Sequence, residues 1–158
     1  MKELYIIRHT QKDSIENFND DYDVTLTQKG KEDAKKLGIK LKEKNIIPDL
    51  IVSSPAIRAR TTADIIAKQI NYKKSIMFNE VIYQAFLNEL IESITYTFDT
   101  VNSLMIIGHN PALTALAMTF GGFNEELKMG NAIKIEFNCN SWTDIDKTNA
   151  KFIELIEI

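Results

Sequence analysis

The two histidines of the chain occupy matching places in the sequence. His9 follows the apolar run Leu4–Ile7 and an arginine, and His109 follows the apolar run Leu104–Ile107 and a glycine. In parallel α/β sheets, ligands bind beyond the carboxyl ends of the strands, so two such histidines face one crevice if their strands are neighbours. One histidine in such a place is most simply a surface or loop residue. Two in matched places favour a functional site.

A third apolar run, Leu50–Val52, leads directly into a helical pattern. The start of such a helix offers free backbone N–H groups and a positive dipole end to an anion. Arg58 lies in its early turns, near enough to reach the same crevice, whereas helical geometry points Arg60 elsewhere. Arg8 adds a second guanidinium beside His9. Alone, an arginine near a capped helix start is usually structural, so its weight comes from the two histidine segments, and together the three point to an anion site.

The elements that position these residues are those of an α/β domain. Short β-rich runs alternate with helical periodicity, which predicts a largely parallel sheet. The segment 138–147 is polar and could be a hairpin loop between antiparallel neighbours at the end of the sheet. The expected strands are Leu4–Ile7, Leu50–Val52, Ser75–Phe78, Leu104–Ile107, Ile133–Phe137 and Phe152–Ile156.

Four stretches with a helical apolar period predict four helices. The first is expected to be capped by Thr27, and the third to run from about Phe86 to Phe98. The second is expected to begin at Ser54-Pro55, and the fourth to begin at Asn110-Pro111 and end at Gly121-Gly122. Their expected buried residues are, in order, Ala34, Leu37, Gly38 and Leu41; Ala59, Ala63, Ile66 and Ile70; Leu87, Leu90, Ile91, Ile94 and Phe98; and Leu113, Leu116, Ala117 and Phe120.

Composition restricts the remaining possibilities. A chain of 158 residues with 44% apolar content suits one domain over 1–158. A charged fraction of 26% and a net charge of −3 supply no basic field for a nucleic acid or an anionic membrane. The first apolar run is too short for a signal peptide or a membrane span, and Cys139 is the only cysteine. We therefore expect a cytoplasmic protein with neither kind of partner.

Four segments together resemble the histidine phosphatase superfamily, also called the phosphoglycerate-mutase-like family. Each is weak alone, but all four occur in order along nearly the whole chain, and the closest resemblance is to the compact SixA-like phosphohistidine phosphatases. The resemblance implies a three-layer α/β/α fold with a mostly parallel central sheet. The matching segments are Arg8-His9-Thr10, Leu26-Thr27 with Gly30 and Ala34, Ser54-Pro55 with Arg58-Ala59 and Thr62-Ala63, and Gly108-His109-Asn110-Pro111.

The resemblance also implies roles for these residues. His9 is expected to be the nucleophile that forms a phosphohistidine intermediate, while Arg8, Arg58 and His109 line the phosphate pocket. Phosphoryl transfer is mostly positioning and stabilisation of charge on the equatorial oxygens. Two guanidiniums and an imidazole can provide this without a metal or another cofactor. The expected substrate-binding residues are Arg8, Thr10, Arg58, His109 and Asn110.

Thr10 departs from the family pattern, and the role of Glu80 is open. Thr10 stands where many relatives have glycine, so a torsion that is easy for glycine is either reached here with strain or avoided. Its hydroxyl could contact phosphate or only cap the turn. Larger relatives have an acidic residue that protonates the leaving oxygen, and the nearest equivalent here is Glu80. A solvated loop acid is an equally good interpretation of Glu80.

The segment from Arg58 to His109 leaves little room for a lid domain, which predicts a shallow, open pocket. Such a pocket admits a phosphorylated side chain displayed on a protein. Phosphohistidine also has a leaving nitrogen that can take a proton from solvent, so it is the favoured substrate. A small-molecule phosphomonoesterase and a catalytically silent phosphate-binding module stay open as alternatives. A phospho-accepting receiver module would instead place an acidic cluster at the strand ends.

Overall fold

The computed structural model describes all 158 residues, and its centre is a six-stranded sheet. The strand order is β3-β2-β4-β1-β5-β6. The first four strands are parallel to one another, and β5 and β6 run antiparallel to their neighbours. This confirms the mostly parallel sheet and the hairpin at its end. The strands are β1 Lys2–Arg8, β2 Leu50–Ser53, β3 Met77–Phe78, β4 Ser103–Gly108, β5 Ala132–Phe137 and β6 Ala150–Ile156.

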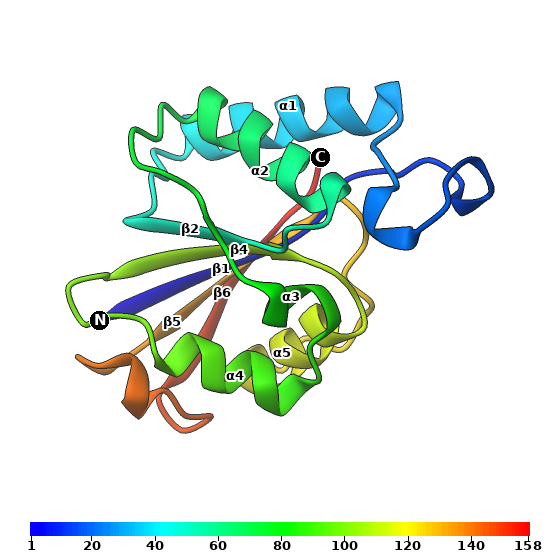
Figure 1. Cartoon of the computed structure of the whole chain (residues 1–158). Helices are drawn as coiled ribbons and strands as arrows, with labels where there is room; N and C mark the ends of the chain where they lie inside the picture. The colour runs from blue at the N-terminus through cyan, green and yellow to red at the C-terminus, as the bar shows by residue number, and fades with distance from the viewer.

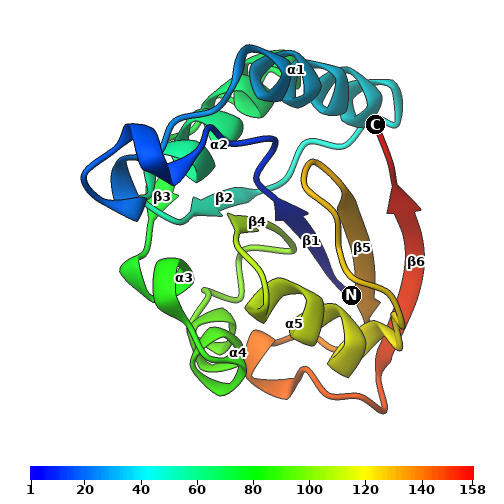
Figure 2. The same cartoon turned by 90° about the vertical axis from the view of Figure 1, so that its right-hand side faces the viewer.

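Helices cover both faces of the sheet, as Figures 1 and 2 show, and this arrangement confirms the three layers. One face carries α1 (Gln28–Glu43) and α2 (Ile57–Gln69). The other carries α3 (Glu80–Gln84), α4 (Leu87–Thr95) and α5 (Ala112–Gly121). No helix has both the length and the apolar character that crossing a bilayer requires. The short 3₁₀ helices are η1 (Ile15–Asn17), η2 (Asp21–Asp23) and η3 (Trp142–Asp144).

The sheet separates two apolar layers, because successive side chains of a strand point to opposite faces. In β1, Leu4 and Ile6 belong to the layer under α4 and α5, whereas Tyr5 and Ile7 belong to the layer under α1 and α2. All four are buried, so β1 reads as a continuous apolar run, as strands covered on both faces do. The predicted buried faces of α1, α2 and α5 are confirmed.

The cap of the first helix is also as predicted. The Thr27 hydroxyl accepts a hydrogen bond from the backbone N–H of Gly30 at 3.0 Å, and α1 begins at the next residue. At the end of α5, Gly122 has a left-handed backbone with φ of 64°, which stops the helix as the glycine pair predicts.

Other helix boundaries differ from the prediction. Helix α2 begins at Ile57 rather than at Ser54-Pro55, because the backbone N–H of Ser54 still pairs with the carbonyl of Ile107 in the direction of the strand. Helix α4 ends at Thr95, so Phe98 lies beyond it and is 81% exposed instead of buried. The predicted strand Ser75–Phe78 is shortened to Met77–Phe78.

The short helix α3 was not predicted from the sequence. Asn79 caps it, with its side-chain oxygen accepting a hydrogen bond from the backbone N–H of Val81 at 3.0 Å. Five residues are too few to display a helical period, and only Ile82 among them is buried. This helix matters for the candidate site at the strand ends, because it carries Tyr83.

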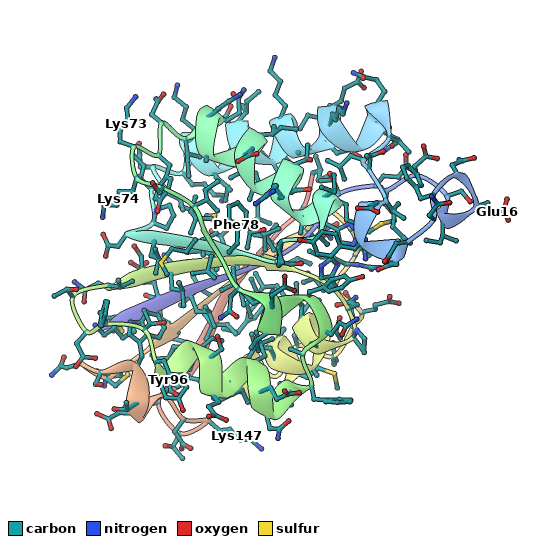
Figure 3. The ribbon with its side chains drawn as sticks, viewed as in Figure 1. Glu16, Lys73, Lys74, Phe78, Tyr96 and Lys147 are labelled. Atoms are coloured by element: carbon teal, nitrogen blue, oxygen red, sulfur yellow. The ribbon has the colours of Figure 1, made fainter.

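The position of β4 between β1 and β2 brings three strand ends to one edge of the sheet. The register pairs Arg8 of β1 with Gly108 of β4, and Ser53 of β2 with Ile107 of β4. The residues that follow these strands therefore lie next to one another. The segment 11–27 also lies at this edge, and its tip, marked by Glu16 in Figure 3, is on the opposite side of the molecule from Lys73 and Lys74.

Candidate active site

His9 is buried at the end of β1, with only 3% of its surface exposed. Its Nδ1 lies 2.7 Å from the carbonyl oxygen of Thr10. A carbonyl can only accept a hydrogen bond, so Nδ1 carries the proton and Nε2 keeps its lone pair. The backbone N–H of Thr10 is in turn held by the hydroxyl of Thr62 on α2, at 3.3 Å. The ring of His9 is thus fixed in the tautomer that a nucleophilic Nε2 needs.

His109 lies beside His9, with 5.1 Å between the ring centroids. Its Nε2 is 2.8 Å from the hydroxyl of Ser54, the residue after β2. The remaining ring nitrogen, Nδ1, is buried and has no hydrogen-bond partner. The sequence pattern assigns Ser54 only to the start of the second helix and does not predict its contact with His109.

The two arginines are each held by their Nη groups. Arg8 Nη1 donates to the carbonyl of Leu127 at 3.0 Å and lies 3.5 Å from the carboxylate of Glu126. Arg58 donates from Nη1 to the carbonyl of Asp21 at 2.6 Å and from Nη2 to its carboxylate at 2.9 Å. In both residues, the Nε–H group is buried and has no partner.

The three buried side-chain atoms without a partner therefore belong to the three residues expected to line the phosphate pocket. They are the Nε atoms of Arg8 and Arg58 and the Nδ1 atom of His109. A buried donor that makes no hydrogen bond costs about 1–3 kcal/mol, so proteins rarely keep one without a use. An oxyanion is the natural partner, since its oxygens accept hydrogen bonds from guanidinium and imidazole groups.

Burial and nearby positive charge keep both histidines neutral. Burial is the main cause that lowers the pKa of His9 to about 4, and Arg58 and Arg8 lower it further, although the hydrogen bond to Thr10 opposes the shift. Burial also lowers the pKa of His109 to about 3, with contributions from His9 and Arg58. At neutral pH, His9 is thus in the uncharged form that can attack phosphorus.

Thr10 and Asn110 have their side chains engaged with the protein. The Thr10 hydroxyl is fully buried and lies 3.4 Å from the hydroxyl of Thr62. Thr10 does not have a positive φ, so the torsion that favours glycine is avoided rather than strained. The Asn110 side chain accepts from the backbone and hydroxyl of Thr114 and donates to the carbonyl of Leu127 at 2.8 Å. That carbonyl also accepts a hydrogen bond from Nη1 of Arg8, so Asn110 and Arg8 share one acceptor.

Glu80 is exposed at the start of α3. Tyr83, from the same helix, reaches the site instead. Its hydroxyl donates to the carboxylate of Asp21 at 2.9 Å, and its ring lies 5.6 Å from that of His109. Sequence reasoning missed Asp21 and Tyr83, because they occupy segments without apolar periodicity. The only visible signal was the acidic run at 20–23, and such loop acids are ordinarily solvated.

An apolar cavity elsewhere in the structure does not fit this chemistry. A cavity of about 290 Å³ lies between the sheet and α4, and it is lined mainly by apolar side chains with no charged residue. An anion would find no compensating charge there. No group of three or more histidine, cysteine or acidic side chains is placed to hold a metal ion. The cluster of arginine and histidine side chains at the ends of β1, β2 and β4 is the candidate site for phosphate.

Comparison with known proteins shows which protein family the sequence matches. Residues 4–98 match the model of the histidine phosphatase superfamily, branch 1. An uncharacterized chloroplastic protein of Arabidopsis thaliana is 26% identical over 152 residues, which are 90% of this chain and 70% of that protein. Further curated relatives, which are phosphoglycerate mutases and serine/threonine phosphatases, are matched over about a quarter of their own length.

Solved structures show the same fold at low sequence identity. A structure from Nakamurella multipartita, provisionally assigned as the phosphohistidine phosphatase SixA, superposes with a TM-score of 0.85 at 17% identity, covering 99% of this chain and 95% of that one. The protein histidine phosphatase SixA complexed with tungstate gives a TM-score of 0.82 at 16% identity, with 98% and 96% covered. The SixA-like fold expected from the sequence is thus confirmed.

Proposed function

This chain belongs to the histidine phosphatase superfamily, and we propose that it removes phosphoryl groups from phosphohistidine on proteins through an intermediate on His9. The observation that carries the proposal is the set of unpartnered polar atoms around a histidine that is held neutral: the Nε–H donors of Arg8 and Arg58, and Nδ1 of His109, which donates in the tautomer whose Nε2 accepts from the Ser54 hydroxyl. Arg8, Arg58 and His109 offer hydrogen bonds to the oxygens of a phosphoryl group, and His9 offers a lone pair to its phosphorus. These are the two requirements of phosphoryl transfer to a protein nucleophile.

The proposed reaction has two steps. Nε2 of His9 forms a bond to phosphorus while the bond from phosphorus to the leaving nitrogen breaks, and that nitrogen takes a proton from solvent. Water then attacks the phosphorus, the bond to Nε2 breaks, and inorganic phosphate leaves with His9 restored. In both steps, the guanidiniums stabilise charge on the three equatorial oxygens, as a preorganised set of donors does.

Phosphohistidine is the favoured substrate for two reasons. The fold is that of structures named for phosphohistidine phosphatase activity. In addition, Glu80 is exposed at the start of α3, and a leaving nitrogen is less dependent on a dedicated acid than a leaving alkoxide is. A small phosphomonoester is the alternative substrate. Its leaving alkoxide would need a proton donor, and the Tyr83 hydroxyl, whose pKa burial and Asp21 raise to about 12, is a weak one.

The experiment is to trap the intermediate. The protein is incubated briefly with a phosphohistidine-containing protein or with phosphoramidate, and the reaction is stopped with alkali. We expect a label that is stable in base and labile in acid, located on Nε2 of His9, and we expect His9→Ala to lose both the label and turnover.

A panel of phosphomonoesters measured alongside identifies the substrate class. Faster turnover of the esters than of the phosphoramidates would contradict phosphohistidine as the substrate. A label on another residue, or near-normal turnover by the His9 variant, would contradict attack by His9. Phosphate binding without turnover of any substrate would identify a silent binding module. Thermal unfolding of the variant serves as the control for folding.

A further inference from the structure

Asp21 is the centre of three hydrogen bonds that meet beside the proposed phosphate pocket. Its backbone carbonyl accepts from Nη1 of Arg58 at 2.6 Å. Its carboxylate oxygen Oδ2 accepts both from Nη2 of Arg58 and from the hydroxyl of Tyr83, each at 2.9 Å. One residue therefore links the segment after β1, helix α2 and helix α3.

These contacts fix the direction of the third nitrogen of Arg58. A guanidinium is planar and rigid, so holding Nη1 and Nη2 leaves the plane no freedom to turn. Nε is then aimed by the same two contacts, and Nε is the atom that is buried without a partner. A guanidinium with one Nη held only by water would swing, and its Nε–H would meet the phosphoryl oxygens only part of the time.

We propose that Asp21 is a positioning residue that aims the Arg58 guanidinium at the transferring phosphoryl group, with Tyr83 holding the Asp21 carboxylate in place. The inference rests on the proposed function and adds a residue that acts through Arg58. Its role is to keep the pocket in the geometry of the transition state before substrate arrives. Preorganisation of this kind raises the rate constant of the chemical step more than it raises affinity.

The charges of the pair support this role rather than one in proton transfer. The Arg58 side chain is 7% exposed, so it needs a nearby negative charge, and the Asp21 carboxylate supplies one. Burial alone would raise the pKa of Asp21, but hydrogen bonds from Arg58 and Tyr83 outweigh that effect and lower it. Asp21 therefore stays ionised at neutral pH and has no proton to give to a leaving group.

The other arginine of the pocket has a different support. Arg8 is held by the carbonyl of Leu127, and its nearest carboxylate, on Glu126, lies 3.5 Å away with 73% of the side chain exposed. An ion pair that is so open contributes little in water. The Asp21 side chain is also 47% exposed, but its carboxylate accepts two hydrogen bonds at 2.9 Å and its segment is ordered by η2, whose start is capped by Asp20. The chain thus provides a fixed carboxylate for Arg58.

The test compares Asp21→Asn with Asp23→Asn. Both variants remove one negative charge from η2, but the Asp23 side chain is exposed and makes no hydrogen bond or ion pair. With phosphoramidate as substrate, we expect Asp21→Asn to lower kcat about tenfold to a hundredfold with little change in KM, because small misplacements of a catalytic group have effects of that size. Asp23→Asn and the wild type should have equal rate constants.

A double-mutant cycle with Arg58→Ala separates positioning from a structural role. If Asp21 acts through Arg58, the double variant Asp21→Asn/Arg58→Ala should be no slower than Arg58→Ala alone. Fully additive losses would overturn the inference, as would a kcat for Asp21→Asn within twofold of wild type. A loss that tracks a lower unfolding temperature and is the same in the Arg58→Ala background would also overturn it. Failure of the proposed function is distinguishable, because the wild type itself would then neither turn over nor become labelled.

Discussion

At the scale of single residues, the two buried histidines link stability to pH. Each has a pKa well below the ordinary 6.5 in the folded protein, about 4 for His9 and about 3 for His109, because burial disfavours the charged ring. In the unfolded chain both histidines titrate near 6.5. Below that pH, the unfolded state therefore binds more protons than the folded state does. The free energy of unfolding should therefore decrease as the pH is lowered from about 6.5 towards the folded pKa values, by up to about 1.4 kcal/mol per pH unit for each histidine.

The measurement is denaturant unfolding between pH 7.5 and 5, a range chosen to lie above most carboxylate titrations. A His109→Gln variant provides the control, since one of the two titrating rings is gone and the slope should be about half that of the wild type. A free energy that is flat between pH 6.5 and 5 would show that the histidines are accessible to protons in the folded protein.

The residues of the proposed site differ in how far the sequence could predict them. His9, His109, Arg8 and Arg58 stand next to strand ends or helix starts, and their residue types suit phosphate, so their proximity could be predicted. Ser54, Asp21 and Tyr83 could not be assigned, because their roles depend on contacts between segments far apart in sequence. Asp21 meets Arg58 across 37 positions and Tyr83 across 62. No local pattern encodes such a pairing.

At the scale of elements, the glycine that follows the Thr27 cap has a packing role. Gly30 lies against the backbone of Gln11, and a methyl group at this position would overlap the Gln11 carbonyl. Backbone cannot move aside as a flexible side chain can, so Gly30→Ala should separate α1 from the segment 11–27 that carries Asp21. We expect a loss of about 1–3 kcal/mol in the free energy of unfolding, as overpacking produces.

Lys31→Ala is the matched control for that variant, because Lys31 is the next residue of α1 and is exposed. Its unfolding free energy should stay within about 0.5 kcal/mol of wild type, as is usual for surface substitutions. Turnover by Gly30→Ala should fall as well, since Arg58 would lose part of its support. A Gly30→Ala protein as stable and active as wild type would show that α1 can shift without cost.

The element boundaries that could not be predicted share a physical reason. Apolar periodicity reports which residues are buried, but it does not report where a strand stops pairing. The backbone of Ser54 continues the strand by one residue and delays α2. Phe98 continued the apolar period of α4, yet it lies outside the helix and is exposed. Long periodic helices such as α1 were predictable, and five-residue α3 was not.

At the scale of the whole molecule, the positive charge of the candidate site comes from arginines that are built into the fold. Arg8 lies at the end of the central sheet, and Arg58 is 5% exposed in α2. No set of side chains is arranged as metal ligands. We therefore expect turnover of phosphoramidate to be unchanged in an excess of chelator, measured as initial rate. Loss of the rate in chelator, with recovery on addition of one divalent cation, would contradict a metal-independent reaction.

The place of β4 in the sheet also determines when the site can exist during synthesis. Strand β1 pairs only with β4 and β5, and β2 reaches β1 only through β4. A growing chain therefore carries β1 without any strand partner until Ser103–Gly108 has left the ribosome. Such distant pairings are slow to form and leave apolar edges open meanwhile. His9 follows β1 and His109 follows β4, so the two histidines come together only when these strands pair, and a product truncated before β4 lacks the second histidine and cannot form the site.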